Sequence, residues 1–432
     1  MESEGNPPPP AAEPPLGKGA CKESEGIGKM RAYERLLRYA VVDSQSAQEA
    51  AVTPSTDKQF DMARLLKDEM EAMGLARVYA DGHAYVYGFL PATPGREDDA
   101  VIGLIAHIDT APDFNGTGVR PCVVESYDGG DLKLGESGLV LSPAQFPDLK
   151  ACVGHTLVTT DGTTLLGADD KAGIAEILTA CERLMAGGRP HGGVALCFPP
   201  DEEIGHGAAL LDLERLGAAF AYTVDGGALE EINCETFNAA AACFTIRGVS
   251  VHPGSAKDVM VNASLVAMEI NAQLPPDEIP ARTEGYQGYY HVTDIAGDVS
   301  RAELKYIIRD HDAARFAARC DKMHAIEAAM NEKYGAGTVT LTLREEYRNM
   351  AEALKGREEI VERAQKAVKA AGLTPVIRPV RGGTDGSQLS FRGLPCPNLG
   401  TGGAGFHGPY EHISAERMDK AVEILLNIIC GE

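Results

Sequence analysis

The chain has 432 residues, of which 44% are hydrophobic and 24% are charged, proportions typical of a globular protein with more than one domain. Its formal net charge of −23 argues against nucleic acid or an anionic membrane as a partner, because both would repel it. Ten scattered cysteines without a Cys-x-x-Cys pair favour reduced thiols, and no apolar run approaches the ~18 residues needed to cross a bilayer, so we expect a cytoplasmic protein.

The first half of the chain predicts an α/β sheet. Residues 1–29, with four consecutive prolines at 7–10, are too polar to bury a core and are expected to be a disordered Pro-rich extension. Amphipathic patterns then predict helices at 29–42 and 57–73. The elements that follow are three buried strands and two helices, at 100–106, 173–185 (helix), 194–198, 208–216 (helix) and 219–224. Alternating strands and helices indicate a sheet with helices on both sides.

The pattern changes near residue 238. The elements expected next are four strands and two helices, at 241–246, 261–274 (helix), 291–296, 304–308, 313–333 (helix) and 338–343. Such a set suggests a separate α+β sandwich. A helix, a strand and a helix then return at 357–371, 374–378 and 416–429. We therefore expect residues 238–346 to form a domain inserted into a first domain, which residues 30–237 and 347–432 build together.

Five polar clusters lie at the ends of apolar runs or in glycine-rich turns, where a rigid sheet can present their side chains. They are His107 with Asp109, Asp169 with Asp170, Glu202 with Glu203, Asp225, and His407. All come from the His, Asp and Glu set that binds zinc. Open α/β sheets place their ligands at the carboxyl ends of the strands. Together the clusters indicate the site of a two-metal hydrolase.

Each cluster also has a structural explanation when it is considered alone. His107 and Asp109 could be a buried histidine and a helix cap, Asp170 could cap a helix, and Asp225 could belong to a turn. The acidic run at 201–203 could be a solvated loop. However, three adjacent carboxylates repel one another unless a cation lies among them. With a metal present, one glutamate can ligate while its neighbour takes a proton from a bound water.

Four segments carry a resemblance to a known family. They are residues 106–116 (AHIDTAPDFNG), 167–173 (GADDKAG), 200–205 (PDEEIG) and 381–386 (RGGTDG). From about Met30 to the C-terminus the chain resembles the two-zinc exopeptidases that include aminoacylase and carboxypeptidase G, and within them the tripeptide aminopeptidases. The resemblance implies a three-layer α/β catalytic domain of the zinc-exopeptidase type. It also implies that the inserted α+β sandwich is a lid or dimerisation domain, which leaves a homodimer through this domain open.

The resemblance further implies a set of metal ligands. His107 and Asp225 would hold one zinc ion, Glu203 and His407 would hold the other, and Asp169 would bridge both; Co²⁺ or Mn²⁺ could replace zinc. Asp109 would lie behind His107, and Glu202 would be the general base. The Asp169–Asp170 peptide bond would be cis, a rare arrangement without proline.

Three further residues would act on the substrate. His252, in the loop at 250–254, would lie over the site and polarise the scissile carbonyl, although it could instead be a loop histidine packed beside Pro253. Arg309 and Arg381 would bind the terminal carboxylate of the peptide, which suits a guanidinium fork.

These roles imply an enzyme that releases the N-terminal residue of small peptides, in particular tripeptides. A related N-acyl amino acid hydrolase, dipeptidase or carboxypeptidase would use the same metal chemistry, because specificity resides in the pocket residues. A catalytically dead homologue that serves as a binding module is the alternative of another class. The intact set of ligands and base argues against it.

Overall fold

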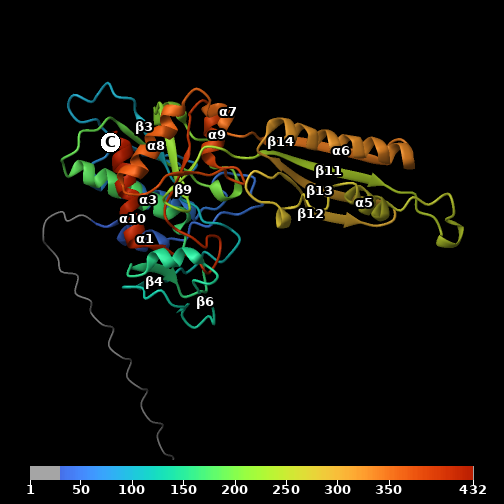
Figure 1. Ribbon diagram of the computed structural model, residues 1–432, viewed down its shortest axis with the longest axis horizontal. Coiled ribbons are helices and arrows are strands. Elements are labelled where there is room, and N and C mark those ends of the chain that lie inside the picture. The colour runs from blue at the N-terminus through green and yellow to red at the C-terminus, as the bar shows by residue number, and fades with distance from the viewer. Residues whose placement is uncertain (1–29, 432) are drawn as a thin grey trace, which may run out of the picture.

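The structure is a computed structural model that describes residues 30–431, drawn in colour in Figure 1. The predicted Pro-rich extension, residues 1–29, lies outside the described residues. The chain forms a larger α/β body and an elongated α+β body that projects from one side of it (Figure 1). No helix within residues 30–431 is long and apolar enough to cross a membrane. None of the nine cysteines in this range forms a disulfide bond with another.

An eight-stranded mixed sheet forms the centre of the larger body. Its order is β1 (Ala76–Ala80), β2 (Val86–Leu90), β8 (Val194–Phe198), β3 (Ile102–Ile105), β9 (Phe220–Gly226), β16 (Asn398–Gly400), β10 (Glu231–Asn233) and β15 (Val376–Ile377). The four central strands β8, β3, β9 and β16 run parallel. Strands β3 and β8 are buried along their whole length, as their continuous apolar sequences predict. Because parallel strands end at one edge, residues that follow β3, β8 and β9 meet there.

Helices cover both faces of this sheet, so the predicted three-layer α/β fold is confirmed. The first face is covered by α1 (Ala32–Ala40), α2 (Gln59–Met73), α3 (Ala168–Met185), α8 (Glu358–Ala370) and α10 (Ala415–Cys430). The second face is covered by α4 (Leu213–Leu216) and α9 (Asp385–Phe391), whose Leu216 and Leu389 pack on Ile105. The short α7 (Ala351–Leu354) contacts α9.

The helix predicted at 208–216 was too long. Only residues 213–216 are helical, because Asp212 caps this helix by accepting the N–H of Arg215. The carbonyls of Ala208 and Leu211 accept hydrogen bonds from the Arg392 guanidinium instead.

Two small sheets lie beside the larger body and were not predicted. They are formed by β4 (Pro121–Val124), β7 (Leu157–Thr160) and β17 (Ile413–Ser414), and by β5 (Leu132–Lys133) and β6 (Val140–Leu141). Together with the 3-10 helix η1 (Pro147–Cys152), they enclose a small core that contains Tyr127, Leu134 and Leu141.

The elongated body contains the four strands and two helices that were predicted for it. Its antiparallel sheet has the order β12 (Tyr289–Gly297), β13 (Arg301–Asp310), β11 (Asn238–Arg247) and β14 (Val339–Tyr347). The helices α5 (Ala263–Ala272) and α6 (Ala313–Tyr334) pack on this sheet. The short 3-10 helices η3 (Pro253–Ser255) and η4 (Pro280–Arg282) lie in its loops. A separate apolar core, with Phe244, Leu304 and Ile326 among its residues, holds the body together.

The two connections between the bodies lie next to each other. The N–H of Asn349 donates to Oδ1 of Asn238 at 3.0 Å, and the N–H of Thr236 donates to Oδ1 of Asn349 at 3.0 Å. Nδ2 of Asn238 donates to the carbonyls of Asp310 and His311, at 3.1 and 3.0 Å. These buried hydrogen bonds join the chain segment that enters the elongated body to the segment that leaves it.

Candidate active site

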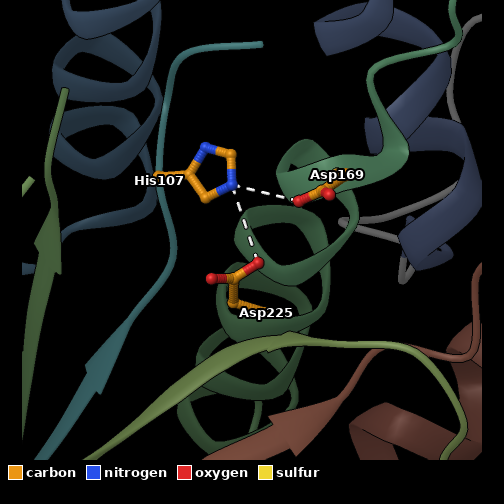
Figure 2. Close-up of side chains that lie close together, drawn as sticks. All are labelled: His107, Asp169 and Asp225. Atoms are coloured by element: carbon orange, nitrogen blue, oxygen red, sulfur yellow. Dashed lines mark hydrogen bonds and ion pairs between the residues drawn. The ribbon is translucent and has the colours of Figure 1, made fainter. Parts of the chain in front are cut away.

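His107 lies just beyond β3, at the carboxyl edge of the central sheet, and is buried. Its Nδ1 is 3.1 Å from the backbone oxygen of Asp109 and 3.3 Å from the carboxylate Oδ1 of the same residue. A proton on Nδ1 satisfies these acceptors and leaves Nε2 free to act as a ligand. Nε2 faces Oδ1 of Asp169 at 3.0 Å and Oδ1 of Asp225 at 3.6 Å, as Figure 2 shows.

Asp169 is the second residue of α3 and directly follows the turn that contains Gly167. The Asp169–Asp170 peptide bond is cis. The two oxygens of Asp169 face different partners, because Oδ1 contacts His107 while Oδ2 lies 3.4 Å from Nε2 of His407. Asp170 has the capping role that its position allows. Its carboxylate accepts the N–H of Gly173 and the N–H of His107, both at 3.2 Å.

Asp225 lies near the end of β9, the strand that pairs with β3. The register of the two strands explains why Asp225 meets His107. Thr223 pairs with Ile105, so Asp225 and His107 each lie two residues beyond this pair. The carboxyl of Asp225 is largely buried. This burial raises its pKa to about 6, against the opposing effect of His107.

A second cluster adjoins the first and shares Asp169 with it. Oε2 of Glu203, from the 3-10 helix η2 (Glu202–Ile204), lies 2.9 Å from Nε2 of His407. The other oxygen of Glu203, Oε1, is buried and has no hydrogen-bond partner among the described residues. Burial and then the neighbouring Asp169 carboxylate raise the pKa of Glu203 to about 7. A buried carboxylate oxygen without a donor is the arrangement that a bound cation would complete.

The two clusters fit a pair of divalent cations. In each of the groups His107–Asp169–Asp225 and Asp169–Glu203–His407, the potential ligand atoms lie within 4.8 Å of one another. The donor set contains imidazole nitrogens and carboxylate oxygens, which suit zinc and similar ions. Each group offers three protein ligands, the number that leaves a catalytic zinc ion one open position.

Asp109 and Glu202 belong to neither group but lie directly beside them. The buried carboxylate of Asp109 accepts the backbone N–H of Glu202 at 3.0 Å and that of Glu203 at 3.3 Å. It therefore links the ring of His107 to the turn that carries both glutamates. Burial, then the charges of Asp225 and Asp385, hold the pKa of Glu202 well above its usual range.

The third acid of the run, Asp201, points away from the clusters. Its buried carboxylate accepts the N–H of Ser55 at 2.7 Å and Nε2 of Gln59 at 2.6 Å, at the start of α2. The expectation that all three adjacent carboxylates surround a cation is therefore wrong for Asp201. Hydrogen bonds compensate its charge instead.

A cleft with a volume of about 840 Å³ separates the two bodies at this site. Glu202, Glu203 and His407 line one wall, and Arg309 with Tyr347 lines the opposite wall on the elongated body. Arg309 therefore lines the same cleft as Glu203 and His407.

Arg381 is not among the residues that line this cleft. Its Nη1 donates to the carbonyls of Gly285 and Gln287, both at 2.8 Å, and its Nη2 donates to Oγ1 of Thr283 at 2.8 Å. The guanidinium also lies over the rings of Phe237 and Tyr289. In this conformation Arg381 holds the elongated body against the larger one, because it donates to two backbone carbonyls and one hydroxyl of that body.

His252 is not brought to the site either, which corrects the expectation that its loop lies over the metals. Arg309, at the cleft, pairs with Ala239 near the start of β11, whereas His252 follows the end of β11. The ten residues of this strand span about 33 Å at ~3.3 Å per residue. The loop between β11 and α5 lies at the far right of Figure 1. The exposed Nδ1 of His252, a residue of this loop, accepts the N–H of Gly254 at 3.1 Å.

Glu411 is a residue of the site region that the sequence patterns did not single out. It is buried, and its carboxylate accepts the N–H groups of Leu166, Gly167 and Asp169 at 2.7, 2.8 and 2.9 Å. The available signal was weak. It consists of an acid four residues after His407 in the same glycine-rich loop.

Comparisons with known proteins agree with this fold and site. A family model described as Peptidase family M20/M25/M40 matches residues 156–430, and the chain belongs to this family. A curated relative named Peptidase T from Bacillus licheniformis is 50% identical over 403 residues, which are 93% of this chain and 98% of the relative. Peptidase T from Desulfitobacterium hafniense strain DSM 10664 / DCB-2 is 52% identical over 400 residues, or 92% and 97% of the two chains.

Solved structures show the same fold at lower identity. The aminopeptidase PepT from Bacillus cereus has a TM-score of 0.74 at 24% identity, with 94% of this chain and 99% of that chain covered. A tripeptidase from Staphylococcus aureus has a TM-score of 0.73 at 22% identity, with 93% and 98% covered. A dinuclear metal-binding peptidase of the M20 family from Bacillus subtilis has a TM-score of 0.61 at 14% identity, with 92% and 96% covered. The predicted family of metallopeptidases is confirmed.

Proposed function

We propose that the protein is a two-metal aminopeptidase that releases the N-terminal residue of tripeptides. The observation that carries this proposal is the double ligand group with Asp169 shared between its halves, open to a cleft that has Arg309 on its other wall. The curated relatives named Peptidase T, about half identical over more than nine tenths of this chain, support an aminopeptidase in particular.

The two ions would be held by five side chains. His107 and Asp225 would bind one, Glu203 and His407 would bind the other, and Asp169 would give one oxygen to each. Zinc fits this donor set best, and Co²⁺ or Mn²⁺ could occupy it. Bound divalent ions would supply Lewis-acid polarisation of the peptide carbonyl and lower the pKa of a water molecule toward neutrality.

Glu202 would be the general base. It lines the cleft beside Glu203 but belongs to neither ligand group, so its carboxylate remains available for proton transfer. It would take a proton from the attacking water and deliver it to the leaving amine nitrogen. Asp109 would keep Glu202 in place through the backbone hydrogen bond of 3.0 Å, and would fix the ring of His107.

Arg309 would bind the terminal carboxylate of the peptide. A guanidinium pairs with a carboxylate in a short-range and directional way. Its position across the cleft from the ligand groups would therefore measure the length of the substrate. A tripeptide would span the distance, a dipeptide would fall short, and a longer chain would collide.

We further propose the division into a catalytic domain (residues 30–237 and 347–432) and an inserted domain (residues 238–346). The inserted domain exposes apolar side chains on α5 and β12, namely Leu265, Met268 and Ile295, at 60%, 61% and 55% exposure. Such side chains favour a homodimer through this domain. In that case a second copy could supply His252 to a cleft, which His252 of the same chain does not reach.

We also propose that the protein is cytoplasmic, because its scattered cysteines, without a Cys-x-x-Cys pair, suit a reducing compartment.

A substrate panel tests the proposed function. Purified protein, with and without added Zn²⁺ or Co²⁺, would be assayed on di-, tri- and tetrapeptides, each free, N-acetylated and C-terminally amidated. The proposal expects metal-dependent release of the first residue, fastest from free tripeptides. Amidation of the tripeptide should lower kcat/KM, because the peptide would lose the carboxylate that pairs with Arg309. Faster hydrolysis of N-acetylated substrates would favour the N-acyl amino acid hydrolase, and faster hydrolysis of dipeptides would favour the dipeptidase.

A further inference from the structure

We propose that Glu346 occupies, in the free protein, the edge of the Arg309 guanidinium on which the terminal carboxylate of a peptide would bind. This internal carboxylate would compete with the substrate and thereby set the KM for peptides with a free C-terminus. The inference rests on the proposed function, since it requires Arg309 to bind the substrate carboxylate.

Arg309 is fixed in place before any ligand binds. Its Nη1 donates to the carbonyl oxygens of Ala240 and Ile308, at 3.3 and 3.1 Å. Its guanidinium carbon lies 5.2 Å from the ring centre of Tyr347, within the range of a cation–π contact. The side chain is only 10% exposed. The backbone carbonyls thus occupy Nη1, and Nη2 is left for a carboxylate.

Glu346 already uses this remaining position. Its Oε2 accepts a hydrogen bond from Nη2 of Arg309 at 3.1 Å. Both residues line the same cleft as Glu203 and His407. A substrate carboxylate that approached Arg309 would meet a second carboxylate on the same donor, and two like charges at this distance repel each other. Arg309 still has N–H groups that Glu346 does not use, but the repulsion means that the substrate carboxylate would bind more tightly once Glu346 has moved away.

The surroundings of Glu346 allow such a movement. Its side chain is 28% exposed, which is far more than that of Arg309. Its other oxygen, Oε1, lies 3.8 Å from Nη2 of Arg344, a side chain that is 78% exposed. Arg344 can therefore keep the displaced carboxylate paired in the wall of the cleft. When displaced, Glu346 would lose its ion pair with Arg309 but keep its ion pair with Arg344, which leaves Arg309 to the substrate.

Glu345 provides a matched control. It carries the same charge, lines the same cleft and directly precedes Glu346 on β14. However, its carboxylate pairs with Arg348 at 3.4 Å, and no contact joins it to Arg309 within the described residues. Changing Glu345 to glutamine alters the charge of the cleft by the same amount without releasing the guanidinium.

The test compares Glu346→Gln and Glu345→Gln with the parent protein, each loaded with the same metal. Steady-state kinetics would be measured on one tripeptide, free and C-terminally amidated. We expect Glu346→Gln to lower the KM for the free tripeptide about three- to fivefold, the size of a partly exposed ion pair. Its kcat should stay the same, because the competition affects only substrate binding. The KM for the amidated tripeptide, and both constants of Glu345→Gln, should change by less than about twofold.

Three results would overturn the inference. An unchanged KM in Glu346→Gln would show that the two carboxylates do not compete, and a raised KM would show that Glu346 holds Arg309 in its binding position. An equal fall of KM in Glu345→Gln would show that only the overall charge of the cleft matters. A parent protein that cleaves no tripeptide would contradict the proposed function instead, so the two failures are distinguishable.

Discussion

The backbone amide of Asp169 donates a hydrogen bond of 2.9 Å to Oε1 of Glu411, a residue 242 positions further along the chain. The same carboxylate accepts the N–H groups of Leu166 and Gly167 through Oε2. Burial raises the pKa of Glu411 to about 7, although these N–H groups oppose the rise. One side chain thus joins the turn before α3, which carries the proposed bridging ligand, to the loop that carries His407.

Replacement of Glu411 should therefore loosen the metal site without removing a ligand. In Glu411→Gln, the amide NH₂ would face backbone N–H groups in place of a carboxylate oxygen. We expect metal affinity to fall ~10–100-fold, the usual effect of losing a group that orients ligands. Titration of the metal-free protein against a competing chelator would measure it. Unchanged affinity together with an unchanged melting temperature would contradict a positioning role.

Glu202→Gln should keep both metal ions and lose most of the turnover. The substitution removes the proton acceptor and leaves all five proposed ligands in place, and loss of a general base costs ~10²–10⁴-fold in rate. Elemental analysis would give the metal content, and kcat on a free tripeptide would give the activity. Loss of metal, or a kcat equal to that of the parent, would show that the roles of Glu202 and Glu203 had been exchanged.

Arg381→Ala should act on the junction between the bodies and not on substrate choice. The side chain binds three oxygens of residues 283–287, so its loss should speed amide hydrogen exchange in this segment. The preference for free over amidated tripeptides should remain, whereas Arg309→Ala should erase most of it. If both variants lost the preference to the same degree, Arg381 would contact the carboxylate in a closed state.

Glu176 predicts a pH dependence of stability that is separate from the metal site. It lies within α3 with both carboxyl oxygens buried and unpartnered among the described residues. This burial raises the pKa of Glu176 well above its ordinary value of 4.5. In the unfolded chain Glu176 loses its proton near pH 4.5, while the folded protein keeps it. Its presence therefore lowers the free energy of unfolding progressively as the pH rises above 4.5, until the folded pKa is reached.

The uncharged variant Glu176→Gln should lack this contribution. Its free energy of unfolding relative to the parent should increase between pH 5 and 8, by at most ~1.4 kcal/mol per pH unit. Urea unfolding of the metal-free proteins at several pH values would measure the difference. Two curves that stay parallel over this range would show that Glu176 is ionised in the folded protein.

The central sheet could be predicted because a strand that is buried on both faces appears in the sequence as a run of apolar residues. Strands β3 and β8 are apolar and buried throughout, and β9 is buried over its first five residues. Residues at the carboxyl ends of these parallel strands meet at one edge of the sheet. The strand predicted at 374–378 contains β15 (Val376–Ile377). Strand β16 was not predicted, because its three residues are too few to show a period. Strand β1 alternates between partly buried and exposed residues at the edge of the sheet, and its sequence, Ala-Arg-Val-Tyr-Ala, gives little contrast.

The candidate ligands were predictable for a related reason, since each follows a buried strand or sits in a glycine-rich turn. The hydrogen-bond partners of Arg381 and the distance of His252 from the cleft could not be predicted from the sequence. Both depend on how the elongated body is placed against the larger one, and no local pattern carries that information. Glu411 was missed because a single acid in a loop has many ordinary explanations.

The hydrogen bond between Asn238 and Asn349 has a consequence for the history of this fold. More than a hundred residues separate Asn238 and Asn349, but the two ends of the elongated body lie side by side. The insertion therefore enters and leaves the larger body at neighbouring points, as a short surface loop does. A change in the length or sequence of the insert leaves the geometry of the attachment point unaltered. Exchange of the whole segment among related enzymes would then alter which peptides are accepted while the ligand-bearing sheet folds as before.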